Sequence, residues 1–167
     1  MKKIYFASPW FTAAQLERET RLIAKLRELG FDVFSPRESS NISGSFADIR
    51  VQESTFNVNL ENIDDCDILF AVSDGKQGIC TELDKLDTPM QAIDPGTMFE
   101  VGYAYNNRRN TKQKPIMVYY AETLGNAQFN LMLARSADIV ITEFKTLDAL
   151  PELIENNCRV EYNGQIE

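Results

Sequence analysis

The chain has 167 residues, with 17 Lys and Arg against 25 Asp and Glu, for a net charge of −8. This length predicts one domain over residues 1–167, and the negative charge disfavours nucleic acid as a partner. No apolar run approaches the roughly 20 residues needed to span a bilayer, so we expect no membrane partner. The first residues turn polar too soon for a signal peptide, and we therefore expect a cytoplasmic protein.

Histidine is absent from the sequence, which excludes Ser-His-Asp and Cys-His catalysis and His-ligated zinc. Any catalysis then uses carboxylates, Tyr, Lys, Cys or backbone groups. The three cysteines, Cys66, Cys80 and Cys158, are widely spaced and form no CxxC pair. We predict that they are buried reduced thiols, and we expect neither a metal nor an organic cofactor.

Apolar periodicity predicts strands and helices in alternation along the first half of the chain. Thr12 and Gln15 have the spacing of a capping box, which indicates a helix that begins there and ends at Gly30. A second helix is expected from about 49 to 63, with Val51, Phe56, Leu60 and Ile63 facing inward. The strands are expected at 2–6, 31–34 and 67–73, and a polar loop at 35–47.

The second half opens with residues 74–95, which are too rich in Gly and Pro for a regular element and too long for an ordinary connection. Loops of this length are usually functional, so we expect a lid or a binding loop. After the loop, helices are expected at 97–107, 127–134 and 147–156, the last of them interrupted by Pro151 near its start, and strands are expected at 116–120 and 138–141.

This alternation predicts an α/β fold: a doubly wound sandwich whose sheet has five mostly parallel strands with helices on both faces, flavodoxin-like or Rossmann-like. Ligands in such sheets bind beyond the carboxyl ends of the strands. The candidate binding segments are therefore those that follow the strands, at 7–11, 35–45, 74–100 and 121–130.

The stretch from Asp94 to Tyr103 carries the strongest chemical signal. Its Pro95-Gly96 turn predicts a helix that starts near Thr97, with Glu100 in the first turn, where the helix dipole would keep a carboxylate ionised. An ionised carboxylate beside a second acid, Asp94, suits covalent glycosyl transfer. Considered alone, the same residues also fit a common helix stabiliser after a common turn.

Several short motifs extend this signal along essentially the whole chain. They are Ile4-Tyr5-Phe6, Trp10-Phe11, Asp65-Cys66-Asp67-Ile68, the block from Asp94 to Gly102, Phe129-Asn130-Leu131-Met132 and Tyr162-Asn163-Gly164. In order and spacing, they resemble the nucleoside 2-deoxyribosyltransferases, enzymes that move 2-deoxyribose between nucleobases.

The resemblance implies a role for each matching residue. Glu100 takes the place of the nucleophile, Asp94 that of an acid assisting the base, and Tyr5 that of a tyrosine contacting the nucleophile. Asn130 matches a residue lent to a neighbouring subunit, and the carboxylate of Glu167 matches a C-terminus that reaches the site.

The resemblance also implies a set of substrate-binding residues, and one of them departs from the family pattern. Many members have an Asp where this chain has Asn59, so acid/base work falls more heavily on Asp94, while Asn59 can still hydrogen-bond a base or sugar. Trp10 and Phe11 either stack on a base or pack in the core. Gly96, Met98 and Met132 complete the expected contacts.

The expected reaction is a retaining two-step transfer through a deoxyribosyl ester of Glu100. Its partners would be deoxynucleosides and free nucleobases, within a homo-oligomer that is at least a dimer and, by family analogy, a hexamer. Two alternatives stay open: a deoxynucleoside 5′-monophosphate N-hydrolase of the same superfamily, and a non-catalytic flavodoxin-like or receiver-type module.

The arginines near these segments are not expected to bind substrate. Arg50 is expected to form an ion pair with Asp48, and Arg108 and Arg109 are expected to stabilise the C-terminus of a helix.

Overall fold

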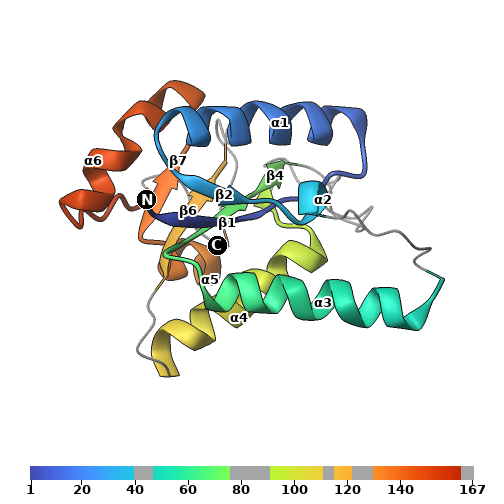
Figure 1. The fold of residues 1–167 in the computed structure, drawn as a ribbon. Coiled ribbons are helices and arrows are strands. Elements are labelled where there is room, and N and C mark those ends of the chain that lie inside the picture. The colour runs from blue at the N-terminus through green and yellow to red at the C-terminus, as the bar shows by residue number, and fades with distance from the viewer. Residues whose placement is uncertain (40–46, 76–90, 111–114, 122–129, 163–167) are drawn as a thin grey trace, which may run out of the picture.

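The computed structural model of this protein describes residues 1–39, 47–75, 91–110, 115–121 and 130–162. None of the helices in these ranges is long and apolar enough to cross a membrane. The main sheet has five strands, all of them parallel (Figure 1). They are β1 (Lys3–Ala7), β2 (Asp32–Phe34), β3 (Ile68–Val72), β6 (Ile116–Tyr120) and β7 (Ile139–Ile141).

The strand order is β2-β1-β3-β6-β7, which confirms the predicted α/β class and is the flavodoxin-like order. In this order the chain winds in opposite directions from β1, so the topological switch point lies between β1 and β3. A separate two-stranded antiparallel ribbon pairs β4 (Asp74–Gly75) with β5 (Gln91–Ala92). The ribbon leads directly into the segment that carries Asp94 and Glu100.

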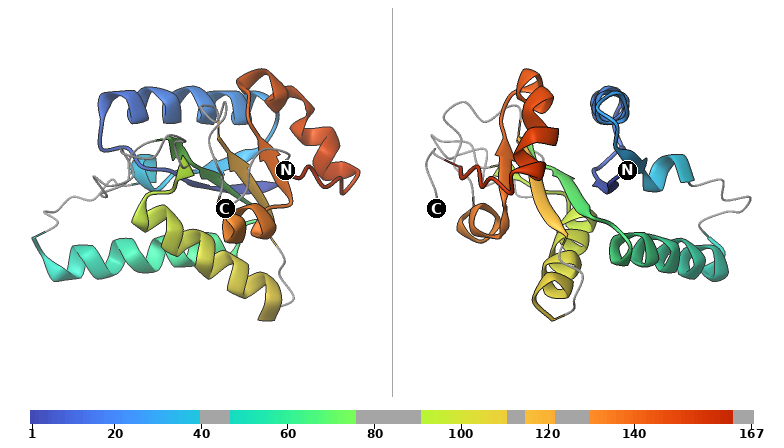
Figure 2. Two further views of the ribbon diagram at one scale, coloured as in Figure 1. Left: turned by 180° about the vertical axis from the view of Figure 1, so that it is seen from behind. Right: turned by 60° about the vertical axis from the view of Figure 1, so that its left-hand side comes forward.

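Helices cover both faces of the sheet, as Figures 1 and 2 show. On one face lie α1 (Ala13–Glu28), the 3-10 helix η2 (Phe144–Ala149) and α6 (Leu150–Glu155). On the other face lie α3 (Ile49–Asp64), α4 (Pro95–Asn110) and α5 (Leu131–Ser136).

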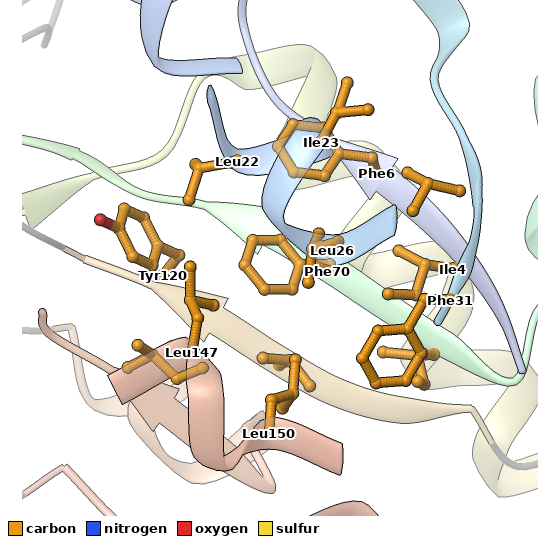
Figure 3. Packing of buried hydrophobic residues seen from close by; sticks show 14 of the residues in the cluster. Ile4, Phe6, Leu22, Ile23, Leu26, Phe31, Phe70, Tyr120, Leu147 and Leu150 are labelled. Carbon is orange, nitrogen blue, oxygen red and sulfur yellow. The ribbon is translucent and has the colours of Figure 1, made fainter. Parts of the chain in front are cut away.

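Alternation along β1 divides its side chains between two hydrophobic clusters. Ile4 and Phe6 pack toward α1, against Leu22 and Leu26, in the cluster drawn in Figure 3. Tyr5 belongs to the cluster on the other face of the sheet, which α3, α4 and α5 cover, and it is fully buried there. Because successive side chains of a strand point to opposite faces, Tyr5 is aimed at the layer that contains α4.

The boundaries of α1 confirm the sequence signals. The Thr12 hydroxyl accepts from the Gln15 amide, and the Gln15 side chain accepts from the Thr12 amide, which completes the capping box. At the other end, Gly30 has a φ of 88°, and its amide bonds back to the Arg27 carbonyl. Residues with a Cβ rarely adopt this backbone conformation, which is why glycine ends the helix here.

Several predicted boundaries were wrong. The helix α4 begins at Pro95 rather than near Thr97 and extends to Asn110, because proline needs no amide partner in a first helical turn. The helix expected at 147–156 is observed as η2 followed by α6. The expected interruption near Pro151 is confirmed, since α6 starts at Leu150 with Pro151 in its first turn. The expected loop at 35–47 begins with a short helix, α2 (Pro36–Ser39), while residues 40–46 lie outside the described ranges.

Helix α3 is less buried than its apolar pattern predicted. Ile63 is buried, but Val51 and Leu60 are only partly covered and Phe56 is half exposed.

The short helix expected at 127–134 is observed as α5, which starts at Leu131 after an Asn130 cap. Residues 127–129 lie outside the described ranges. The pairing of Arg50 with Asp48 is confirmed, at 2.8 Å between Nη2 and Oδ2.

The cysteine prediction is correct in part. Cys66 is buried, and burial raises the pKa of its thiol to about 12. Cys158 is exposed, contrary to the expectation of burial, because it follows α6 at the surface. Cys80 lies outside the described ranges.

We predict opposite effects of alanine at two glycines where a Cβ would meet no atom within 4 Å. Gly30→Ala should lower the free energy of unfolding by about 1 kcal/mol, since φ must stay positive. Gly102→Ala, within α4, should raise it by about 0.5–1 kcal/mol, since alanine has the higher helix propensity. Urea denaturation followed by circular dichroism measures both, and a stabilising Gly30→Ala would contradict the assignment of this helix end.

Candidate active site

The hydrogen bond between Tyr5 and Glu100 is the central contact of the candidate site. The Tyr5 hydroxyl donates to Oε1 of Glu100 at 2.5 Å. Tyr5 comes from the middle of β1, next to the switch point, and Glu100 comes from α4. The fold therefore joins two residues 95 positions apart in sequence, as the resemblance to deoxyribosyltransferases implied.

Burial determines the electrostatics of Glu100. Loss of solvent raises the pKa of this carboxyl to about 7, the Tyr5 hydrogen bond acts to lower it, and the negative charge of Asp94 raises it further. The pKa of Tyr5 is itself raised, first by burial and then by the Glu100 charge. Tyr5 therefore remains a hydroxyl donor near neutral pH, and the contact favours the ionised form of Glu100.

Asp94, not Glu100, occupies the N-terminus of α4. Oδ2 of Asp94 accepts from the Thr97 amide at 3.0 Å and from the Thr97 hydroxyl at 3.4 Å, and the Asp94 carbonyl accepts from the Met98 amide at 2.8 Å. Asp94 is thus the cap of this helix. Thr97 is buried, which holds the Asp94 carboxylate in place.

The expected position of Glu100 therefore needs correction. Since α4 starts at Pro95, Glu100 lies in its second turn, beyond the free amides of the first. The helix terminus does not keep Glu100 ionised, as the sequence argument supposed; its pKa is raised instead of held low. The Tyr5 hydroxyl, which reaches Glu100 through the tertiary structure, supplies the stabilisation that was attributed to the helix dipole.

Gly96 lies against the Asp94 carboxylate. A Cβ at this position would lie 3.1 Å from Oδ2 of Asp94, closer than an ordinary van der Waals contact. Glycine therefore lets the backbone of α4 approach its own capping carboxylate. Met98, expected among the substrate contacts, is on the same helical turn and remains 43% exposed.

The segment after β1 carries Trp10 and Phe11, whose rings are 5.8 Å apart. Phe11 is 73% exposed, so the alternative of core packing is wrong for this residue, while Trp10 is partly buried. The side-chain oxygen of Gln15 accepts from the Phe11 and Thr12 amides and holds this segment against the start of α1. The aromatic pair is therefore presented at the carboxyl edge of the sheet.

Two supporting groups were not found by sequence reasoning. Phe34, at the end of β2, stacks on Tyr5 with ring centroids 5.6 Å apart. Glu19 is buried on α1, where its carboxylate accepts from the Ser35 hydroxyl and the Arg37 guanidinium, both at 2.8 Å. These contacts bind the carboxyl end of β2 to its neighbours. An acidic residue on a largely apolar helix face was the only available signal for Glu19.

The remaining predicted residues lie on other elements. Asn59 is partly buried on α3, and Asn130 caps α5 by accepting from the Met132 amide at 2.9 Å. Met132 is 76% exposed. Across the described part of the chain, neither asparagine hydrogen-bonds to Tyr5, Asp94 or Glu100. Glu167 lies outside the described ranges, as do residues 76–90 of the expected lid.

Metal binding has no visible site in the part of the chain that the structure describes. No group of three or more Cys, Asp or Glu side chains there could hold a metal ion. Among the described residues, the reactive groups gathered here are the carboxyls of Asp94 and Glu100 and the phenolic hydroxyl of Tyr5.

Comparison with known proteins agrees with the flavodoxin-like fold. The sequence profile of the nucleoside 2-deoxyribosyltransferase family matches residues 4–150. The chain therefore belongs to the nucleoside 2-deoxyribosyltransferase family. Among curated proteins, none matches this sequence significantly.

Several solved structures are similar to this chain. A 2-deoxyribosyltransferase from Bacillus psychrosaccharolyticus is 26% identical, with a TM-score of 0.74 over 96% of this chain and 98% of that one. A conserved protein from Enterococcus faecalis V583 is 26% identical, with a TM-score of 0.52 over 100% and 91%. A 2-deoxyribosyltransferase from Leishmania mexicana is 21% identical, with a TM-score of 0.53 over 93% and 98%, and supports the fold alone.

We predict that Tyr5→Phe raises the pKa of Glu100 above 7. Removal of the hydroxyl leaves burial and the Asp94 charge unopposed, and the shift should be about 1 pH unit. Carbon-13 NMR titration of the Glu100 carboxyl measures this value directly. Tyr119→Phe is the matched control, since that buried tyrosine packs in the same cluster but contacts Ser136. An unchanged titration in Tyr5→Phe would contradict the assigned coupling.

Proposed function

We propose that this protein transfers 2-deoxyribose between the nucleobases of 2′-deoxynucleosides, and that residues 1–167 act as one catalytic domain. The observation that carries this proposal is the hydrogen bond from Tyr5 to a partly buried Glu100 at the edge of the sheet where ligands bind. Family membership supports the substrate class. The likeness to the 2-deoxyribosyltransferase from Bacillus psychrosaccharolyticus supports the type of reaction.

Glu100 is the proposed nucleophile. Its Oε1 is engaged by Tyr5, so we assign the attack on the anomeric carbon to Oε2. In the first step an Oε2–C1′ bond forms while the C1′–N bond to the base breaks and its electron pair leaves with the base. In the second step the nitrogen of another base attacks C1′ from the vacated side, which releases Glu100 as a carboxylate and retains configuration.

Asp94 is the proposed acid that assists the departing base. Both of its hydrogen bonds to Thr97 use Oδ2, so Oδ1 is the oxygen that we assign to the base. A proton passed from Oδ1 of Asp94 to the leaving nitrogen neutralises the charge that this nitrogen acquires. In the second step the attacking base loses a proton to Oδ1, which restores the acid. Asn59 has no proton to give and is assigned a hydrogen bond to base or sugar.

Burial of Glu100 sets the expected pH dependence. With a pKa of about 7, Glu100 is largely protonated below that pH and cannot attack. The value of kcat/KM should therefore rise with pH through about 7 in the free enzyme. Hydrolysis of the ester competes with transfer, so water must be kept away from it. A bound base would exclude water from one side, and we predict that residues of the 74–95 segment exclude it from the other.

The deciding test is Glu100→Gln, which keeps the shape of the side chain and removes its nucleophilic charge. Base exchange between thymidine or deoxyinosine and free adenine should fall by at least roughly 10³-fold. Chromatography of the product nucleosides measures the exchange. Glu17→Gln, an exposed change on α1, is the control and should keep the wild-type rate. Near-normal exchange by Glu100→Gln would refute the proposed nucleophile.

The same assay separates transfer from hydrolysis. A transferase converts an added acceptor base into a new deoxynucleoside. A deoxynucleoside 5′-monophosphate N-hydrolase instead releases free base and sugar phosphate, whether or not an acceptor is present. Products of the second kind alone would replace the proposed activity with the hydrolase alternative.

We also propose that the protein is a homo-oligomer that buries apolar residues of α3 and α4. Phe56 and Phe99 are 50% and 51% exposed, and their rings are 5.8 Å apart across the two helices. Met98, which precedes Phe99 on α4, is also 43% exposed. Grouped exposed apolar side chains of this kind mark protein interfaces. Such an interface beside Glu100 fits a site completed by the partner, to which Asn130 would contribute.

We predict that Phe56→Asp dissociates this oligomer, because a charge cannot be buried in an apolar contact without a partner. Size-exclusion chromatography with light scattering should give a multiple of 19.0 kDa for the wild type and about 19.0 kDa for the variant. Leu16→Asp, at a 40% exposed position on α1 of the opposite face, should leave the mass unchanged. A monomeric wild type would contradict the proposal.

A further inference from the structure

A cluster of arginines lies at the opposite end of α4 from the candidate active site. The last turn of α4 carries Arg108 and Arg109, the last turn of α5 carries Arg135, and Arg159 follows α6. All four line one cavity of about 310 Å³, together with Tyr105, Ser136, Ala137 and Asp138. At about 1.5 Å per helical residue, Arg109 is roughly 13 Å along the axis from Glu100.

The charges in this cavity do not balance. Among the described residues, two carboxylates accompany the four guanidinium groups: Asp138 pairs with Arg108, and Glu161 is shared by Arg135 and Arg159. Within the described ranges, no carboxylate pairs with Arg109. The described residues around this cavity therefore carry an excess of positive charge, in a chain whose net charge is −8.

The ion pairs leave guanidinium donors available. Glu161 is 3.7 Å from Arg135 and 3.6 Å from Arg159, beyond good hydrogen-bond length, and all three side chains are more than half exposed. Asp138 is different, because it holds Arg108 at 2.8 Å and also accepts from the Met117 amide at 2.9 Å. Asp138 thus holds the Arg108 guanidinium in place at the edge of the cavity. The side chains of Arg109, Arg135 and Arg159 are free to turn toward a ligand.

Helix dipoles explain only part of this cluster. A positive charge in the last turn of α4 or of α5 stabilises that helix by itself. The dipoles do not account for Arg159, which belongs to neither helix, or for the convergence of three separate segments on one cavity. Like charges gathered in this way repel one another, and a bound anion removes that repulsion.

A second cavity adjoins the first. It also measures about 310 Å³, shares Arg108, Asp138 and Arg159 with the first cavity, and is otherwise lined largely by apolar side chains, among them Ile116, Ile139, Leu153 and Ile154. Each volume is at the lower end of small-molecule sites, which are roughly 300–1,000 Å³. An anionic group beside the arginines could thus extend an organic body over this apolar lining.

We propose that these two cavities form a binding site for a small organic phosphate. The phosphoryl group lies among Arg109, Arg135 and Arg159, since the planar guanidinium fork matches phosphate oxygens. The organic body lies in the apolar cavity between β6, β7 and α6. The site takes no part in the deoxyribosyl transfer proposed above and does not depend on it.

The experiment uses phenyl phosphate and inorganic phosphate as probes, with sodium chloride at matched ionic strength as the reference. Isothermal titration calorimetry on the full chain should detect both, with phenyl phosphate the tighter ligand because its ring enters the apolar cavity. The double variant Arg109→Gln/Arg135→Gln should bind each probe at least about tenfold more weakly. Thermal unfolding in phosphate-free buffer verifies that the variant is folded.

A matched control removes two positive charges elsewhere. Lys2→Gln/Lys145→Gln alters two exposed lysines outside both cavities and should bind both probes like the wild type. The proposal is overturned if the wild type binds neither probe, or if the arginine variant binds as well as the wild type. Equal affinities for the two probes would refute the placement of the organic body.

Discussion

The hydrogen bond between Tyr5 and Glu100 is the constraint on which the candidate site depends. Burial acts against the charge of Glu100, and the Tyr5 hydroxyl is the group that opposes this effect. These opposing effects place the pKa of Glu100 at about 7. A carboxyl with this pKa can act first as a nucleophile and later as a leaving group near neutral pH. A fully solvated carboxylate would ionise more readily but would be a weaker nucleophile toward a sugar carbon, because water would compete for its oxygens.

The parallel sheet brings this pair together. Tyr5 is fixed within β1 between β2 and β3, with its ring stacked on Phe34. The α4 helix reaches Tyr5 because its start is anchored by the Asp94 cap and the buried Thr97. Asp94 thereby serves two purposes: it begins the helix that presents Glu100, and it contributes a negative charge next to that residue.

The two ends of α4 have opposite electrostatic character. Carboxylates gather near its start, where Asp94 caps the helix, and arginines gather near its end, where Arg108 is held by Asp138. This order follows the helix dipole. It also separates the two ligand sites proposed for the molecule, because a negatively charged group is disfavoured beside Asp94 and Glu100 and favoured beside Arg109.

Sequence pattern alone determined the strand and helix alternation, the parallel sheet and the ends of α1, because these depend on periodicity and local capping chemistry. Motif resemblance also predicted the contact between Tyr5 and Glu100, which the structure confirms, while the catalytic roles of Tyr5, Asp94 and Glu100 stay predictions. It missed the start of α4 by two residues and assigned the stabilisation of Glu100 to the wrong group. It also missed Phe34, Glu19 and the convergence of the arginines. The start of α4 is a local error, because it depends on Pro95 and on the cap that Asp94 forms with Thr97. The other errors concern contacts between residues far apart in the chain, whose distances and burial are set only when the sheet and its two helical layers pack together.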